Sequence, residues 1–93
     1  MITKNMLSGV IESMNPPFDS HDVIRKAIHK FQKEYVAQLY AAIDHDFPFQ
    51  YVHSAFGRDI AEICEKHGYV GTEADTPDLF GQSSTCTRWA KPA

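Results

Sequence analysis

The spacing of apolar residues, divided by prolines and glycines into helix-sized segments, constrains this chain more than any other feature of its sequence. Pro16 and Pro17 end the first segment, because proline removes a backbone donor and restricts the residue before it. Within that segment apolar side chains recur every three or four residues, the period of one helical face: Ile2, Met6, Leu7, Val10, Ile11 and Met14. The pattern predicts a helix near residues 2–14.

A second stripe follows residues that suit a helix start. Asp19 or Ser20 can accept hydrogen bonds from the free N–H groups of a first turn, and Asp22 adds favourable negative charge there. One continuous helix fits the period but would be long for a small domain, so we favour two helices near 20–31 and 33–43. We expect the whole stripe in the core: Ile24, Ala27, Ile28, Phe31, Tyr35, Leu39 and Ile43.

A third stripe begins after Pro48, which suits the first position of a helix, and predicts a helix near 49–67. Gly57 interrupts it and leaves two alternatives open: a glycine within one helix, or the turn between two short helices. Gly68 is expected to end the element as a C-cap. The members of this stripe are Phe49, Val52, His53, Phe56, Ile60, Ile63, Cys64 and His67.

The C-terminal segment, residues 71–93, differs from the helical body, residues 1–70, because glycines, prolines and a polar run replace the stripe. The helical body and the C-terminal segment together predict a single domain with a mainly α fold. It would have three to four helices and an irregular or short β-ribbon C-terminal segment. This order of elements resembles the layout of winged-helix proteins.

Three apolar residues in the C-terminal segment predict that part of it folds back onto the helices. Burying one large apolar side chain is worth about 1.5–3 kcal/mol, whereas ordering one residue costs about 1–2 kcal/mol, so backbone pairing must contribute. We expect strand pairing with Tyr69 and Val70 and a mobile stretch from Thr72 to Asp75. The residues expected to dock are Leu79, Phe80 and Trp89.

The length of 93 residues argues against catalysis, because so small a chain has little room for a walled pocket. Ser83, Ser84 and Cys86 are available nucleophiles, but no nucleophile elbow or glycine-rich phosphate loop surrounds them. We therefore predict a non-catalytic protein, with no catalytic residues and no cofactor.

Two cysteines are too few for a disulfide scaffold, and the first residues lack the apolar run of a signal peptide. No stretch approaches the about 18 apolar residues of a membrane span. We expect a cytoplasmic protein with free thiols and no membrane contact. Cys64, His67 and His53 share a helical face, but the paired ligands of a zinc site are missing. No metal site is expected, and Cys64 is assigned to the core.

The net charge of −3 does not favour nucleic acid, because nonspecific affinity comes from neutralising phosphates. Residues 20–33 are an exception, with four basic residues and one acidic residue. Such a helix can contact DNA phosphates, although an amphipathic helix normally carries lysines on its solvated side. The candidate nucleic-acid-binding residues are Arg25, Lys26, His29 and Lys33, with Arg88 and Lys91 near the C-terminus.

Aromatic residues crowd around the loop between the second and third stripes. Exposed tyrosines beside apolar rings are typical of interface centres, but a ring-rich core with tyrosine hydroxyls at its edge fits equally well. The candidate partner-binding residues are Tyr40, Phe47, Phe49 and Tyr51.

The sequence thus predicts a non-catalytic interaction module. Its most concrete form is a small DNA-associated regulator that resembles a winged helix and uses the basic face. The alternative is a protein-binding adaptor or homodimerising domain that uses the aromatic patch. The two predict different surfaces: one contiguous positive face for DNA, and a flat aromatic patch for a protein partner.

Overall fold

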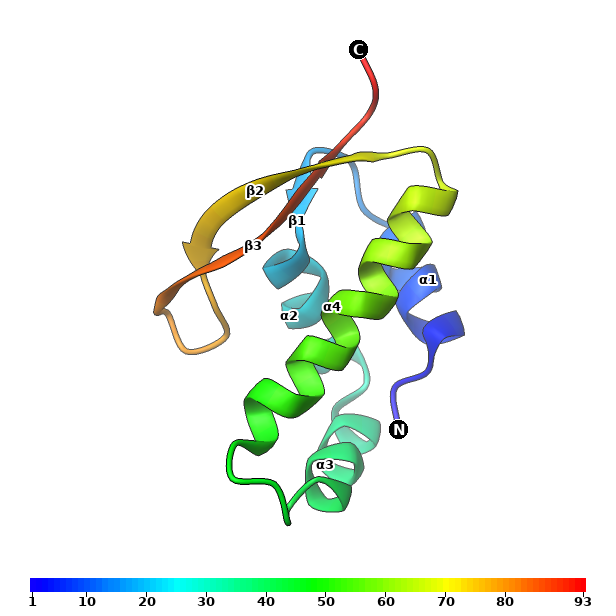
Figure 1. Ribbon diagram of the computed structural model, residues 1–93. Coiled ribbons are helices and arrows are strands. Elements are labelled where there is room, and N and C mark those ends of the chain that lie inside the picture. Colours follow the sequence, from blue (N-terminus) through cyan, green and yellow to red (C-terminus); the bar gives the residue numbers. More distant parts are fainter.

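The computed structural model describes all 93 residues and contains four helices and a three-stranded antiparallel sheet (Figure 1). In its coarse form the predicted fold class is confirmed: a small helical domain with a C-terminal β-ribbon. The short strand β1 was not predicted. In chain order the elements are α1 (Lys4–Glu12), β1 (Phe18–Asp19), α2 (Ser20–Lys30), α3 (Gln32–Ala41), α4 (Pro48–Lys66), β2 (Val70–Pro77) and β3 (Ser83–Ala90).

The sheet has the strand order β1-β3-β2, so the last strand of the chain lies between the other two. β2 and β3 form an antiparallel hairpin whose register pairs Val70 with Ala90. β1 adds to the other side of β3, with Phe18 opposite Trp89. The sheet therefore ties the start of α2 to the C-terminal end of the chain.

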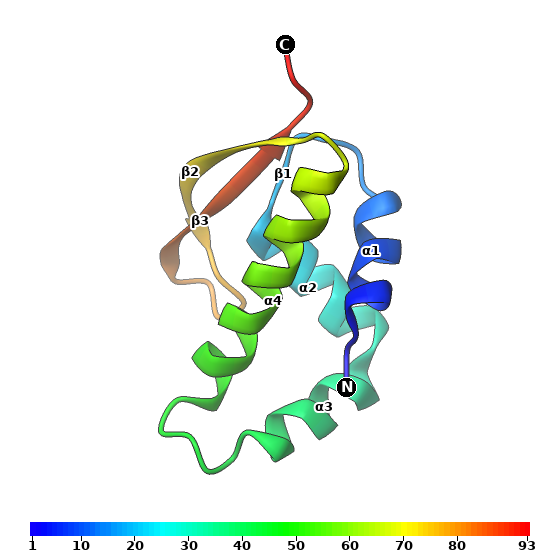
Figure 2. The same ribbon diagram turned by 45° about the vertical axis from the view of Figure 1, so that its right-hand side comes forward.

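One buried cluster joins the helices to the sheet. α4 crosses the middle of the molecule, with α1 and α2 packed behind it in Figure 1 and the hairpin reaching out at its side (Figure 1, Figure 2). α3 lies at one end of this body, whose extents are 43 × 26 × 18 Å. The largest fully buried side chains are Phe56, Leu7, Ile11, Ile60, Val10, Val23, Val52 and Cys64.

The helix boundaries follow the predicted signals. Asp19 is the N-cap of α2, and its side chain accepts a hydrogen bond from the N–H of Asp22 at 2.8 Å. The favoured break in the second stripe occurs at Phe31, where φ is −120° and ψ is 55°. Gly68 follows α4 with φ of 79°, a conformation that favours glycine.

Two open or expected features of the helices are corrected. Gly57 lies inside the continuous helix α4, so the alternative of a turn between two short helices is wrong. Ile43 was expected in the core but is exposed, because α3 ends at Ala41 and Ile43 falls in the turn beyond it.

Two expectations for the C-terminal segment are also wrong. The stretch from Thr72 to Asp75 is paired in β2 rather than left free, because the hairpin register runs through it. Phe80 stays exposed at the hairpin turn, whereas Trp89 docks in the core as expected. Both cysteines are free thiols, with Cys64 buried. None of the four helices combines the length and apolar character needed to cross a membrane.

Candidate functional site

The residues predicted to contact DNA lie in two groups. Arg88 stands on β3 opposite Asp19, at the start of α2, and Lys91 follows the end of β3. The other group has three members on α2 and one at the start of α3, which follows α2 in the chain. Its members, all exposed, are Arg25, Lys26, His29 and Lys33.

Arg25 has intramolecular partners. Its guanidinium donates to the backbone carbonyls of Pro77 at 2.9 Å and Asp78 at 3.3 Å, and lies 3.4 Å from the carboxylate of Asp22. These bonds hold the end of β2 against α2. A DNA phosphate at Arg25 would have to replace them.

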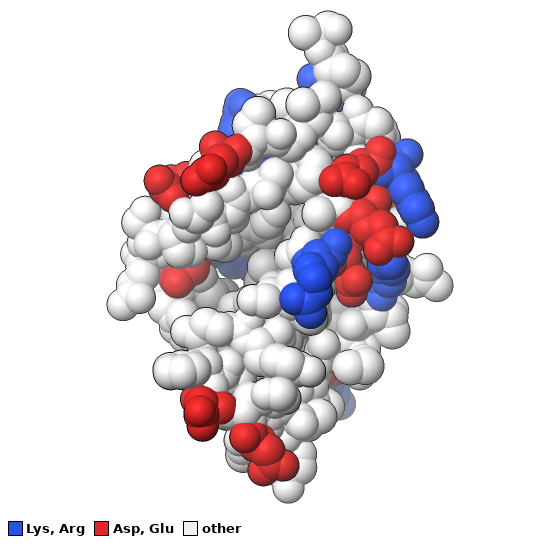
Figure 3. All heavy atoms as spheres, in the orientation of Figure 1, with Lys and Arg blue, Asp and Glu red and all other residues white.

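The two elements that would meet DNA in a winged helix, α4 and the hairpin, carry no excess of positive charge. α4 has two basic and three acidic residues, and the hairpin, residues 70–90, has one basic and three acidic residues. In Figure 3 acidic side chains gather over β2 and at the foot of the molecule, while basic and acidic side chains are mixed over α4. This face has no continuous positive area.

The four candidate aromatic residues are all exposed, and two of them, Phe47 and Tyr51, line one shallow depression. Tyr51 stacks on His45, with ring centroids 3.7 Å apart. Phe49 packs edge-on against Phe80 of the hairpin turn, with centroids 5.0 Å apart. The other two lie on α3 and in the loop before α4, and are Tyr40 and Phe47.

A further apolar surface follows α3. Val36, Tyr40 and Ile43 are 63%, 74% and 63% exposed. Val36 and Tyr40, four residues apart, lie on one side of the helix, and Ile43 lies in the turn just beyond its end. We call these three residues the α3 patch. Lys33 and Ala37 line a shallow groove beside it. The sequence pattern placed Ile43 in the core and indicated Tyr40 as a candidate partner-binding residue.

A cleft of about 590 Å³ separates α4 from the hairpin and from the start of α2. His53 and Arg58 line it from α4, His21 from α2 and Cys86 from β3. No pattern in the sequence indicates a role for His21. Only the tertiary fold brings it to the hairpin, because its contacts lie more than fifty residues away in the chain.

One hydrogen bond links α3 to α4 beside this cleft. The Tyr35 hydroxyl lies 2.7 Å from Nε2 of His53. Burial lowers the pKa of His53 from its ordinary value and raises the pKa of Tyr35 to about 12. At neutral pH the phenol therefore donates to a neutral imidazole.

Comparison with protein-family models, with curated proteins and with solved structures finds no match to this chain. No residue role is therefore transferred from a relative. The exposed α3 patch, the cleft and the side chains around it are the features that bear on function.

Proposed function

We propose that this chain is a non-catalytic interaction module that pairs with a second copy of itself through the α3 patch. The supporting observation is the exposure of Val36 and Tyr40 on one side of a helix that buries only Tyr35, together with the exposure of Ile43 in the turn after that helix. Exposed apolar patches of this kind mark interaction sites. A two-fold contact between copies would cover both patches at once.

α3 buries fewer of its own residues than any of the other helices. It has ten residues, which is too short for an isolated helix to be stable in water. No side chain caps its N-terminus at Phe31. It is attached to the body through Tyr35, through the partly buried Leu39 and through the side chain of Gln38, which accepts a hydrogen bond from the backbone N–H of Ile2 at 3.0 Å. Packing two α3 helices together would supply the missing tertiary support.

The charges at the two ends of α3 favour a second copy over an unrelated partner. Lys33 precedes the patch and Asp44 and Asp46 follow it, and none of them forms an ion pair within the chain. In an antiparallel pairing, Val36 of one copy faces Tyr40 of the other. Lys33 of each copy then meets the acidic end of the other, so opposite charges approach at both ends.

Sedimentation velocity over a hundredfold range of concentration tests this proposal. The parent is expected to dimerise, and Val36→Glu is expected to raise the dimer dissociation constant at least about tenfold, since it buries an unpaired charge. Val70→Glu is the matched control, because Val70 is a similarly exposed valine on β2, outside the patch. A parent that stays monomeric throughout, or equal weakening by both variants, would overturn the proposal.

A charge exchange tests the antiparallel geometry. Lys33→Glu alone and Asp44→Lys alone are each expected to weaken dimerisation by placing like charges together. The double variant is expected to recover most of the parent affinity, because each copy again presents opposite charges to the other. Failure of the double variant to recover would rule out this pairing of the two helices.

A DNA-associated regulator is the second candidate, supported by the arrangement of α4 beside the hairpin and by the strand order β1-β3-β2. This arrangement resembles a winged helix in which α4 enters the major groove. Gln50, Ser54 and Arg58 are exposed on α4, where they can reach base edges. The acidic residues of α4 and the hairpin count against it.

Fluorescence anisotropy with a mixed-sequence duplex at low salt tests the DNA candidate. Loss of binding in Arg58→Ala would support the α4 arrangement, and loss in Lys26→Ala would support the basic face of α2. A binding constant that falls steeply with salt is expected if phosphates are contacted. A parent that does not bind the duplex at low salt would remove the nonspecific form of this candidate.

A further inference from the structure

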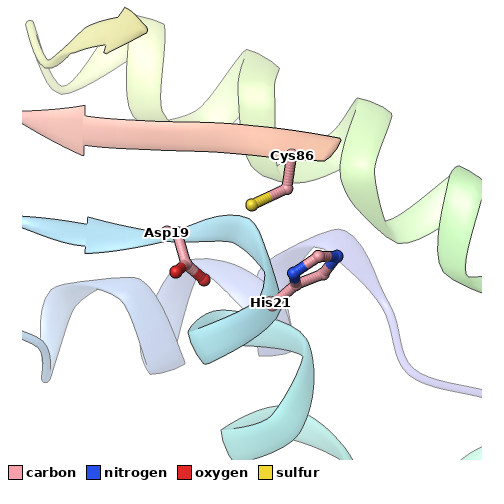
Figure 4. A group of neighbouring side chains, drawn as sticks. All are labelled: Asp19, His21 and Cys86. Atoms are coloured by element: carbon pink, nitrogen blue, oxygen red, sulfur yellow. The ribbon is translucent and has the colours of Figure 1, made fainter. Parts of the chain in front are cut away.

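Three side chains with different donor atoms converge between β3 and the start of α2. Asp19 ends β1, His21 lies in the first turn of α2, and Cys86 lies in the middle of β3. Figure 4 shows the thiol, the imidazole and the carboxylate around one small space beneath β3. All three residues are half-buried, so the space is defined by the fold and is still reached from solvent.

The spacing of the donor atoms is close to what a tetrahedral ion needs. One ligand atom from each of the three residues lies within 4.8 Å of the others. Zinc bonds of about 2.0–2.3 Å in a tetrahedron place ligand atoms roughly 3.3–3.8 Å apart. A contraction of about 1 Å, within the reach of side-chain rotation, would close the site.

Two neighbouring hydroxyls contact the imidazole of His21, and a metal on Nδ1 would replace one of these contacts, that of Thr76. The Thr76 hydroxyl lies 2.8 Å from Nδ1 of His21 and 3.4 Å from Sγ of Cys86, so Nδ1 and the thiol face the same space. On the other side of the ring, Nε2 of His21 lies 3.2 Å from the Ser84 hydroxyl. With a metal on Nδ1, the Nε2–H would donate to Ser84, as metal-bound histidines usually do to a second partner.

Asp19 can bind a cation without giving up its role in the fold. Its Oδ1 accepts the capping hydrogen bond from the N–H of Asp22 at 2.8 Å. Its Oδ2 accepts no hydrogen bond within the chain. One carboxylate oxygen thus caps the helix, while the other is free to ligate.

We propose that Asp19, His21 and Cys86 form a zinc site that fastens the hairpin to the start of α2. A thiolate, an imidazole and a carboxylate are the donor types that zinc takes in proteins. Three protein ligands leave the fourth position to water, so the site is of the open kind. Binding displaces the thiol proton of Cys86 into solvent, because the thiolate is the ligand.

Titration of the metal-free, reduced protein with Co²⁺ and then Zn²⁺ tests the site. One equivalent of Co²⁺ is expected to produce thiolate-to-cobalt absorption in the near ultraviolet, and Zn²⁺ is expected to abolish it by displacement. Each bound ion is expected to release about one proton in weakly buffered solution. Absence of the absorption in the folded parent protein would overturn the proposal.

Matched variants locate the ligands. Cys86→Ser is expected to remove the thiolate absorption. His21→Gln and Asp19→Asn are each expected to weaken Zn²⁺ binding at least about tenfold, and Asn retains the helix cap. Ser84→Ala tests positioning of the imidazole, with an expected weakening of about 10–100-fold and no loss of the thiolate absorption.

Cys64→Ala and His67→Gln are the controls, because they remove the other thiol and the histidine nearest to it in sequence. Both are expected to bind Co²⁺ as the parent does. Absorption that survives in Cys86→Ser, or disappears in Cys64→Ala, would place any metal elsewhere and overturn the assignment. Far-ultraviolet circular dichroism of each variant separates loss of a ligand from loss of the fold.

Discussion

Helices α2 and α3 follow one another and have nearly the same length, yet they differ in how much of their apolar surface is covered. α2 buries Val23, Ile24 and Ala27, whereas α3 buries only Tyr35. α1, α4 and β3 all pack against α2, whereas α3 contacts mainly α4 and α2. The apolar face of a short helix becomes core only where other elements converge on it.

Removing the indole of Trp89 is expected to have the largest effect, because it uncovers α2. Trp89 is 3% exposed, and its Nε1–H donates to the hydroxyl of Ser20 at the start of α2, at 3.3 Å. Trp89→Ala is expected to lower the free energy of unfolding by about 3–5 kcal/mol. Urea denaturation followed by circular dichroism measures it.

Phe80→Ala is the control for that change, since it removes another ring from the same hairpin. Phe80 is exposed and touches only the edge of Phe49 among aromatic rings. A loss within about 0.5–1 kcal/mol is expected. Equal losses in both variants would mean that the hairpin does not cover α2 through Trp89.

The same substitution in both helices sharpens the comparison. Val23 is fully buried in α2 and Val36 is exposed on α3. Val23→Ala is expected to cost about 2 kcal/mol, from two methyl groups at ~0.8 kcal/mol each and the cavity they leave. Val36→Ala is expected to change stability by less than about 0.5 kcal/mol. Both are measured by urea denaturation at concentrations where the chain is monomeric.

Much of the fold could be predicted because its signals are local. Asp19 as a helix cap and Gly68 as a helix end each follow from residues within one turn. The break near Phe31 was favoured only because one continuous helix would be long for a small domain. Ile43 was misplaced because periodicity identifies an apolar face but not the element that covers it. β1 was missed because a two-residue strand exists only through its pairing with β3.

The candidate sites were harder to predict because their residues meet only in three dimensions. His21 and Cys86 are 65 residues apart, and no spacing in the sequence relates them. Conversely, the sequence suggested a phosphate contact for Arg25, but in the structure its guanidinium donates hydrogen bonds to backbone carbonyls of the hairpin. The charge of a residue is visible in the sequence, whereas its partners are not.

After the two core substitutions, loss of the helix cap on α2 is expected to have the next largest effect on the free energy of unfolding. Asp19 caps α2 with a side-chain hydrogen bond, and α3 has no such cap. Asp19→Ala is expected to cost about 1 kcal/mol, and Asp19→Asn, which can still accept the bond, only a few tenths. Thermal melts of metal-free protein measure both. Equal destabilisation would show that the carboxylate charge, rather than the cap, matters here.

The smallest expected effect is a pH dependence of stability located at the hydrogen bond between Tyr35 of α3 and His53 of α4. Burial lowers the pKa of His53 below its ordinary value of 6.5, so the folded protein resists the proton that the unfolded chain accepts. Stability is therefore fully present above about pH 6.5 and is lost as pH falls from there through the folded pKa of His53. Melting temperatures between about pH 7.5 and 5.5, above the range where carboxylates titrate, are expected to fall in the parent. In His53→Gln, which can still accept from Tyr35, the profile is expected to be flatter, whereas His29→Gln, on the exposed side of α2, is expected to follow the parent. A parent melting temperature that does not fall with pH would mean that protonation of His53 does not affect the stability of the fold.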